Sequence, residues 1–263
     1  MKKKPEKEKS KKIEIKVKKD TKDNDNYSEE NELENEYDPS LDPEHIIIFD
    51  CELDLIEDYK AVDLLFLIDT TGSMNCYLKG IKKLMRKIIW DLEKCLSKYL
   101  IDEIDILKVG ILTYKDHEDE DKTYLTNIDI DLNGNLDKVN NIIMSLNCCG
   151  GKDEPEAVLD GLKVALDNIS WREHSIKYIY HILDAPCHGK KYNNIEGDKL
   201  EDCPNNIDVE QLFCEMRNKN INYSIIKLND SLDIMIKEFK KIHSFEVLSP
   251  KVHYDKKDFI PQD

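Results

Sequence analysis

The chain has 263 residues, of which 40% are hydrophobic and 36% are charged, and its formal net charge at pH 7 is -16. This composition suits one globular domain of about 200 residues with a polar extension. The negative charge argues against sequence-independent nucleic-acid binding by the folded part, and no apolar run approaches the roughly 18 residues that a membrane-spanning helix needs.

The first 44 residues carry two blocks of opposite charge. Residues 1–20 contain ten lysines against four acidic residues, and residues 21–44 contain ten acidic residues against one lysine. Such blocks cannot bury a core, so we predict a disordered tail over 1–44. We interpret the lysine block as solvated, with a nuclear-import signal or a nucleic-acid arm as the alternative. The start lacks the apolar core of a secretory signal, and the eight cysteines lack a compact disulfide spacing, which predicts an intracellular, cytoplasmic protein with reduced thiols.

Regular patterns begin near residue 61, after a linker over 45–60, and we place one domain at 61–249 with a C-terminal tail at 250–263. The apolar runs predict buried strands at 61–68, 106–114, 176–184, 221–228 and 245–248. In an edge strand at 122–130, alternation puts Tyr124, Thr126, Ile128 and Ile130 on one side. Helical periodicity predicts helices at 76–99, 135–147, 155–169, 208–219 and 231–243, the third with Pro155 in its first turn. Alternating strands and helices predict an α/β domain whose mostly parallel sheet is covered on both faces.

Polar side chains follow three of the predicted strands. Ligands of open α/β sheets bind where the strands end, so these residues are the candidates for a site. Carboxylates and hydroxyls are hard oxygen ligands that suit Mg²⁺ or Mn²⁺. The strand ends supply Asp69, Thr71, Ser73, Asp116, His117 and Asp184, and a loop before the 155–169 helix adds Gly150, Gly151 and Asp153.

The order of these motifs resembles the von Willebrand factor A domains. Their metal-ion-dependent adhesion site uses D-x-[ST]-x-S after the first strand, a Thr in a Gly-rich loop, and an Asp after a later strand. This chain has DTTGS at 69–73, GGKDEPEA at 150–157 and ILDAP at 182–186. The resemblance implies a Rossmann-like, doubly wound, six-stranded sheet with one antiparallel edge strand. YKDHED, GGKDEPEA and DAPCHG together resemble a subgroup found beside atypical α-kinases and in stand-alone proteins of protists.

The resemblance also implies a set of metal ligands. Asp69, Thr71, Ser73 and Asp184 match the family's positions, and Asp153 stands where the family usually has Thr. With three carboxylates near one divalent ion, we expect tight metal binding and weaker attraction for an acidic group of a partner.

We therefore predict a protein-interaction module that binds Mg²⁺ or Mn²⁺ and meets its partner through an acidic side chain on the ion or through loops that the ion holds. Residues expected to support the ligands or to face the partner are Asp116, His117, Gly151 and His188. A metal-dependent hydrolase with the same carboxylates, and His117 or His188 as base, is one alternative, and a scaffold without metal is another. A dehalogenase-type phosphatase is disfavoured because Thr71 stands where its second acid belongs.

Two weaker patterns offer other metals. Residues 129–140 fit the first nine positions of a calcium loop, but Asn140 replaces the bidentate Glu, so we favour an Asn-Gly turn with Asn135 capping the next helix. A zinc site could draw on Cys148, Cys149, Cys187, Cys203, His117 and His188, although their spacing is not a C-x₂-C pair. Cys187 and His188 could also be a nucleophile and its base, but buried structural thiols are the default interpretation.

Overall fold

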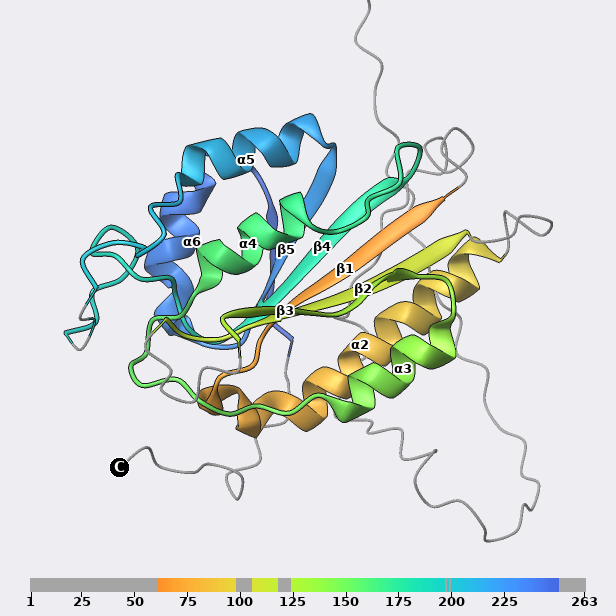
Figure 1. Ribbon diagram of the computed structural model, residues 1–263, viewed down its shortest axis with the longest axis horizontal. Helices are drawn as coiled ribbons and strands as arrows, with labels where there is room; N and C mark the ends of the chain where they lie inside the picture. Colours follow the sequence, from red (N-terminus) through yellow and green to blue (C-terminus); the bar gives the residue numbers. More distant parts are fainter. Residues whose placement is uncertain (1–60, 98–105, 118–123, 197, 199, 251–263) are drawn as a thin grey trace, which may run out of the picture. The chain divides into compact units, whose positions relative to one another are not determined.

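The computed structural model describes residues 61–97, 106–117, 124–196, 198 and 200–250 (Figure 1). The tail predicted at 1–44, the linker at 45–60 and residues 251–263 lie outside the described residues. No helix in the described part is both long and apolar enough to cross a membrane. In chain order the elements are β1 (Val62–Asp69), η1 (Gly72–Met74), α2 (Asn75–Leu96), β2 (Leu107–Tyr114), β3 (Thr126–Asn133), α3 (Leu136–Ser145), α4 (Val158–Asp167), β4 (Ile176–Leu183), α5 (Val209–Asn218), β5 (Ile221–Lys227), η2 (Asp230–Leu232), α6 (Asp233–Lys240) and β6 (Glu246–Leu248).

The strands form one sheet in the order β3-β2-β1-β4-β5-β6. β3 runs antiparallel to β2 at one edge, and the other neighbours are parallel. The predicted fold class, a doubly wound and mostly parallel sheet with one antiparallel edge strand, is therefore confirmed. The strand order reverses at β1, whose neighbours are β2 and β4. This reversal makes the carboxyl ends of β1 and β4 the expected ligand position.

Two separate cores cover the two faces of the sheet. Leu65 and Leu67 of β1 pack with α4, α5 and α6 on one face. Leu64, Phe66 and Ile68 pack with α2 and α3 on the other (Figure 1). The apolar run of β1 is thus continuous because both sides of the strand are buried, as in parallel sheets generally.

The predicted alternation along the edge strand is wrong. The strand spans 126–133, and Ile128 and Ile130 contact opposite cores. The cause is an irregularity in register, since Leu112 pairs with Ile128 while the adjacent Ile111 pairs with Ile130. An extra residue of this kind, here Asp129, reverses which face the following side chains occupy.

The helix predicted at 155–169 begins three residues later, at Val158, so Pro155 does not lie in its first turn. The preceding residues make backbone contacts across the fold instead. Glu156 bridges to Cys187, and the Ala157 amide donates to the Lys115 carbonyl at 3.0 Å. These bonds hold residues 156–157 outside the helix and close to the strand ends.

A buried histidine links three strands in the α4 side of the core. Nδ1 of His181 lies 2.8 Å from the Tyr223 hydroxyl, and Nε2 lies 2.9 Å from the Tyr114 hydroxyl. A neutral ring can satisfy both contacts by donating one hydrogen bond and accepting the other. Complete burial lowers the pKa of His181 to about 3, so the ring stays neutral in the folded protein.

The lowered pKa of His181 predicts an acid-sensitive contribution to stability. An unfolded His titrates near 6.5, so below that pH the unfolded chain binds the extra proton and the free energy of unfolding falls. The contribution is full above pH 6.5 and shrinks by up to about 1.4 kcal/mol per pH unit on the way to pH 3. Urea unfolding of His181→Gln should show a shallower acid dependence than the parent. Parallel curves from pH 7 to pH 4 would contradict this assignment.

Candidate metal centre

Three predicted ligands of the DTTGS loop and a fourth, Asp184, form one chain of contacts. Oδ1 of Asp69 accepts hydrogen bonds from the Thr71 amide at 2.8 Å and the Thr71 hydroxyl at 2.7 Å. The Thr71 and Ser73 hydroxyl oxygens lie 3.4 Å apart, and Ser73 Oγ donates to Oδ1 of Asp184 at 3.0 Å. Asp69, Thr71 and Asp184 are buried, whereas Ser73 is exposed. The predicted residues of β1 and β4 therefore meet at a point that opens to solvent.

The Gly-Gly loop packs directly against this loop. The Gly72 amide donates to the Gly150 carbonyl at 2.8 Å. Gly151 has a φ of +83°, and a Cβ added there would lie 3.2 Å from Cβ of Thr71. A side chain at position 151 would therefore be strained and would press on Thr71, which explains the glycine at this position.

A buried lysine, which no pattern in the sequence indicated, joins the same two loops. The Lys115 ammonium donates to the Thr70 carbonyl at 3.1 Å and also to the Cys149 carbonyl. Its positive charge acts to lower the pKa of Asp69. Lysines are mostly exposed in folded proteins, so a lysine directly after a buried strand is expected to face solvent. The sequence therefore did not indicate that Lys115 is buried.

Burial of several carboxylates makes the centre electrostatically costly. Burial and the charge of Asp184 raise the pKa of Asp69 to about 8, against the hydrogen bonds from Thr71. Burial also raises the pKa of Asp184, although its hydrogen bond from Ser73 acts in the opposite direction. In both residues the charged form is disfavoured because no water surrounds it.

Glu156 is a third buried carboxylate of the centre and was missed in the sequence. Burial, followed by the charges of Asp69 and Asp116, raises its pKa well above the ordinary value. Oε1 of Glu156 lies 3.2 Å from the Cβ position that Gly151 lacks. In the sequence, an acidic residue after Pro155 is explained by the first turn of a helix, where a negative charge stabilises the helix dipole. The sequence therefore did not indicate that Glu156 is buried beside Asp69.

The donor chemistry and the bonding of these carboxylates fit a divalent cation. Oδ2 of Asp69 and Oε2 of Glu156 are buried and make no hydrogen bond. A buried carboxylate oxygen without a partner is costly, and a bound cation would remove that cost. Hydroxyl and carboxylate oxygens are the ligands that Mg²⁺ and Mn²⁺ prefer.

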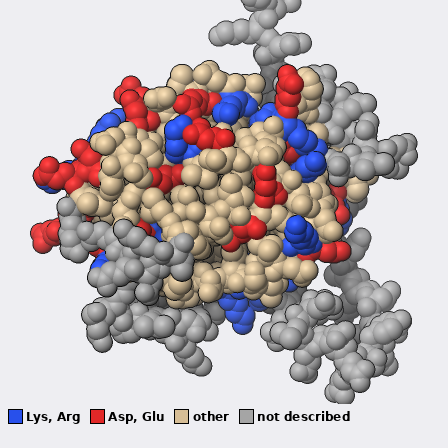
Figure 2. Space-filling view, viewed as in Figure 1, with Lys and Arg blue, Asp and Glu red and all other residues tan. Residues whose placement is uncertain are grey.

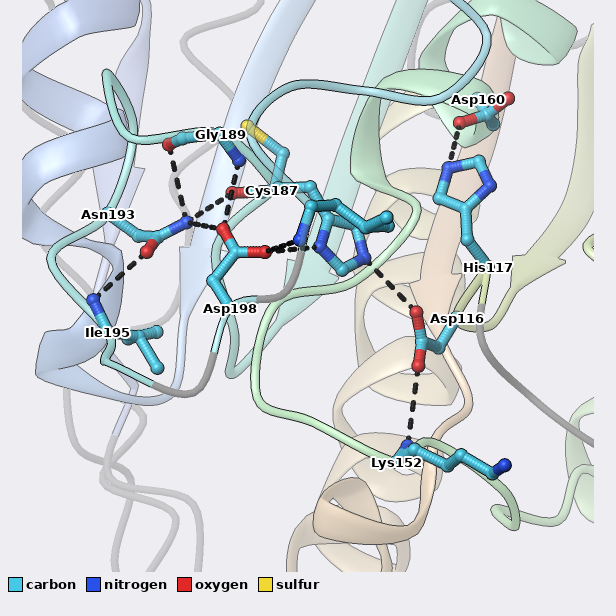
Figure 3. A network of polar contacts seen from close by, with 11 residues as sticks. Asp116, His117, Lys152, Asp160, Cys187, Gly189, Asn193, Ile195 and Asp198 are labelled. Atoms are coloured by element: carbon cyan, nitrogen blue, oxygen red, sulfur yellow. Dashed lines mark hydrogen bonds and ion pairs between the residues drawn. The ribbon is translucent and has the colours of Figure 1, made fainter.

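Asp153, which was predicted as a metal ligand, lies in a cluster with Asp116 and His188, which were expected to support the ligands or to face the partner. One ligand atom from each residue lies within 4.8 Å of the other two. Nε2 of His188 lies 3.1 Å from Oδ1 of Asp116, and its Nδ1 lies 3.0 Å from Oδ1 of Asp198 (Figure 3). Asp153 thus sits beside Asp116 and His188, and Asp198 is a further partner that the sequence did not indicate.

The two histidines near the centre are poorly suited to act as bases. Burial alone would lower the pKa of His188, but hydrogen bonds to Asp116 and Asp198 raise it. For His117, likewise, burial is outweighed by Asp160, and the pKa rises to about 9. The protonated form is therefore favoured in both rings, and in His117 it dominates near neutral pH. Burial also raises the pKa of the Cys187 thiol well above its usual value, which disfavours the nucleophile interpretation.

The residues of the calcium-like loop have structural partners. Asp129 accepts from the Thr113 hydroxyl and the Asn127 amide, each at 2.8 Å. Asp131 accepts from the Ser170 amide at 3.1 Å, and Asn135 caps α3 by accepting from the Lys138 amide at 3.0 Å. The interpretation as a turn and helix cap, rather than a calcium site, explains this segment.

A comparison with protein families decides the identity of the fold. The model of the von Willebrand factor A domain matches residues 63–220. The chain belongs to the von Willebrand factor A domain family. The match includes the DTTGS, GGKDEPEA and ILDAP segments, so the sequence resemblance is confirmed.

Individual relatives are more distant. Alpha-protein kinase vwkA of Dictyostelium discoideum is 29% identical over 199 residues, which are 71% of this chain and 30% of that protein. The chain thus covers less than a third of this relative. Proximal thread matrix protein 1 from the mussel byssus aligns with 73% of this chain and 42% of its own at 14% identity and a TM-score of 0.51. A form of it with a zinc-occupied metal-ion-dependent adhesion site aligns at 15% identity and a TM-score of 0.50, over 72% and 42% of the two chains.

The raised pKa of Asp69 predicts that metal-free protein loses stability as pH rises. Between the unfolded value near 3.8 and the folded value, the native state binds more protons than the unfolded chain, so the free energy of unfolding falls with pH. Between pH 6.5 and 8 the effect of His181 is constant. His117, whose pKa is about 9, also contributes to the fall over this window. In chelator, Asp69→Asn should therefore make the parent's fall shallower without abolishing it, as measured by urea unfolding. An equally steep fall in both proteins would show that Asp69 is not the titrating group.

Proposed function

We propose that this von Willebrand factor A domain binds Mg²⁺ or Mn²⁺ at the DTTGS loop and serves as a protein-interaction module. The observation that carries the proposal is the contact chain from Asp69 through Thr71 and Ser73 to Asp184, with an unbonded carboxylate oxygen buried in it. The zinc-occupied site of the mussel matrix protein is consistent with this family position binding a divalent ion.

The residues would divide the work of holding the ion. Asp69 and Asp184 would supply charge, and Thr71 and Ser73 would supply hydroxyl oxygens. Asp153, which lies beside Asp116 and His188, stays a proposed further ligand from the neighbouring loop. The ion would supply positive charge at an otherwise acidic surface. Because Ser73 is exposed, that charge would be open to a partner's oxygen atom.

The chemistry of the partner follows from the local charge. Asp69, Asp184 and Glu156 together exceed the charge of one divalent ion, even with Lys115 nearby. A neutral carbonyl or hydroxyl of a protein partner therefore suits the centre better than a second strong anion. Acidic and basic side chains are interspersed over the face in Figure 2, which lacks the continuous basic strip typical of nucleic-acid binding. An intracellular location remains our prediction.

The hydrolase alternative receives less support from the geometry. A general base at neutral pH needs an unprotonated nitrogen near the reacting group. Both ring nitrogens of His188 face carboxylates, and the ring of His117 contacts Asp160. Metal-dependent turnover of p-nitrophenyl phosphate that disappears in Asp69→Ala would reverse this preference.

Calorimetric titration tests the proposed metal site. The full chain should bind Mg²⁺ and Mn²⁺, and Asp69→Ala should lose that binding because it removes a central carboxylate. The matched control is Asp167→Ala, which removes an aspartate paired with Lys163 on the exposed part of α4 and should bind as the parent does. Equal binding by Asp69→Ala and the parent would show that the ion lies elsewhere.

A further inference from the structure

A second group of metal-binding side chains converges outside the DTTGS loop. His117 follows β2, Asp160 lies in the first turn of α4, and Cys203 lies in the connection between β4 and α5. One ligand atom from each lies within 4.8 Å of the other two. Asp160 and Cys203 are buried and His117 is half-buried. Figure 3 shows the His117 ring directed at Asp160.

The separations suit a single tetrahedral ion. Nε2 of His117 lies 2.8 Å from Oδ2 of Asp160, and Sγ of Cys203 lies 3.6 Å from the same oxygen. Ligand atoms around tetrahedral Zn²⁺ lie roughly 3.3–3.8 Å apart, given its bond lengths. The 3.6 Å sulfur–oxygen separation fits this range, and the 2.8 Å nitrogen–oxygen contact would open by roughly 0.5 Å to admit the ion. Nε2 makes a close ion-pair contact with the carboxylate but no well-aligned hydrogen bond, so the contact already gathers these two ligand atoms.

The carboxylate of Asp160 is oriented by a neighbour. Asn205 Nδ2 donates to Oδ1 of Asp160 at 2.5 Å. With Oδ1 held in this way, Oδ2 of Asp160 faces His117 and Cys203. Groups that orient a ligand in this way accompany metal sites in general.

We propose that His117, Asp160 and Cys203 form a binding site for Zn²⁺ or a similar thiol-preferring divalent ion. A nitrogen, sulfur and oxygen donor set favours Zn²⁺ over Mg²⁺, which takes oxygen ligands. Three protein ligands leave a fourth position for water or for a group of a partner. The site shares no ligand with the DTTGS loop, so it is independent of the proposed function.

The ion would attach the long connection between β4 and α5 to the residues that follow β2 and to the first turn of α4. The middle of this connection is already anchored at Asp198, which accepts from the Gly189 amide at 3.1 Å and from Asn193 Nδ2 at 2.9 Å. Cys203 lies beyond that anchor. Joining Cys203 to His117 and Asp160 would fix the far end of the connection beside β2 and α4.

Cobalt substitution tests the proposal directly, because a thiolate bound to Co²⁺ gives a charge-transfer band in the near ultraviolet. We expect Co²⁺ titrated into the full, reduced chain to produce this band and Zn²⁺ to abolish it by displacing the Co²⁺. Cys203→Ser and His117→Gln should each lose the band. Cys214→Ser, which changes an exposed cysteine of α5, should keep it.

Two further arms keep the outcomes distinguishable. Asp69→Ala should retain the cobalt band, because none of the three ligands belongs to the DTTGS loop. Cys203→Ser and His117→Gln should retain the Mn²⁺ binding and the circular dichroism of the parent, which shows that they fold. Absence of the band from the parent, or its survival in Cys203→Ser, would overturn the proposal.

Discussion

Buried carboxylates at the carboxyl ends of β1 and β4 are the constraint on which this end of the molecule depends. Asp69, Asp184 and Glu156 are all withdrawn from water, and a buried charge is costly unless it is paired or bound to a cation. The surrounding residues offset part of this cost. Thr71 and Ser73 donate hydrogen bonds, and Lys115 brings a buried positive charge. One carboxylate oxygen of Asp69 and one of Glu156 make no hydrogen bond, so protein groups do not offset the whole cost.

The same end of the sheet is assembled by contacts between segments far apart in the chain. Lys115 connects the loops after β1 and α3, and His188 connects the loops after β2 and β4. A change at the centre would therefore reach several surface loops at once. This arrangement suits a module that recognises a partner with its loops, because binding of an ion and order of the loops would be coupled.

Much of the fold could be predicted from the sequence because its signals are local. Continuous apolar runs predicted the parallel strands, and the DTTGS and ILDAP segments predicted that Asp69 and Asp184 follow neighbouring strands. The late start of α4 at Val158 could not be predicted, since it depends on backbone bonds to Lys115 and Pro186. The reversed faces of β3 depend on an irregularity opposite Ile111. Periodicity does not record such non-local pairings.

In the candidate sites, too, some residues could be predicted from local motifs and others could not. The motifs predicted that Asp69, Thr71, Ser73 and Asp184 lie together, whereas the roles of Glu156, Lys115 and Asp160 were not predictable. Each of these has an ordinary explanation in sequence, as a helix-start acid, a surface lysine or a helical aspartate. Only burial and proximity in the folded chain distinguish them. His117 and Cys203 were considered as zinc ligands, but the aspartate that joins them comes from α4, 43 residues before Cys203.

The most direct measurement of the central claim is an anomalous difference map from crystals of the full chain grown with Mn²⁺. We expect a manganese peak at the DTTGS loop, beside the carboxylates of Asp69 and Asp184 and the hydroxyl of Ser73. Manganese found only at other places, or no peak in crystals that diffract well at the manganese edge, would contradict it.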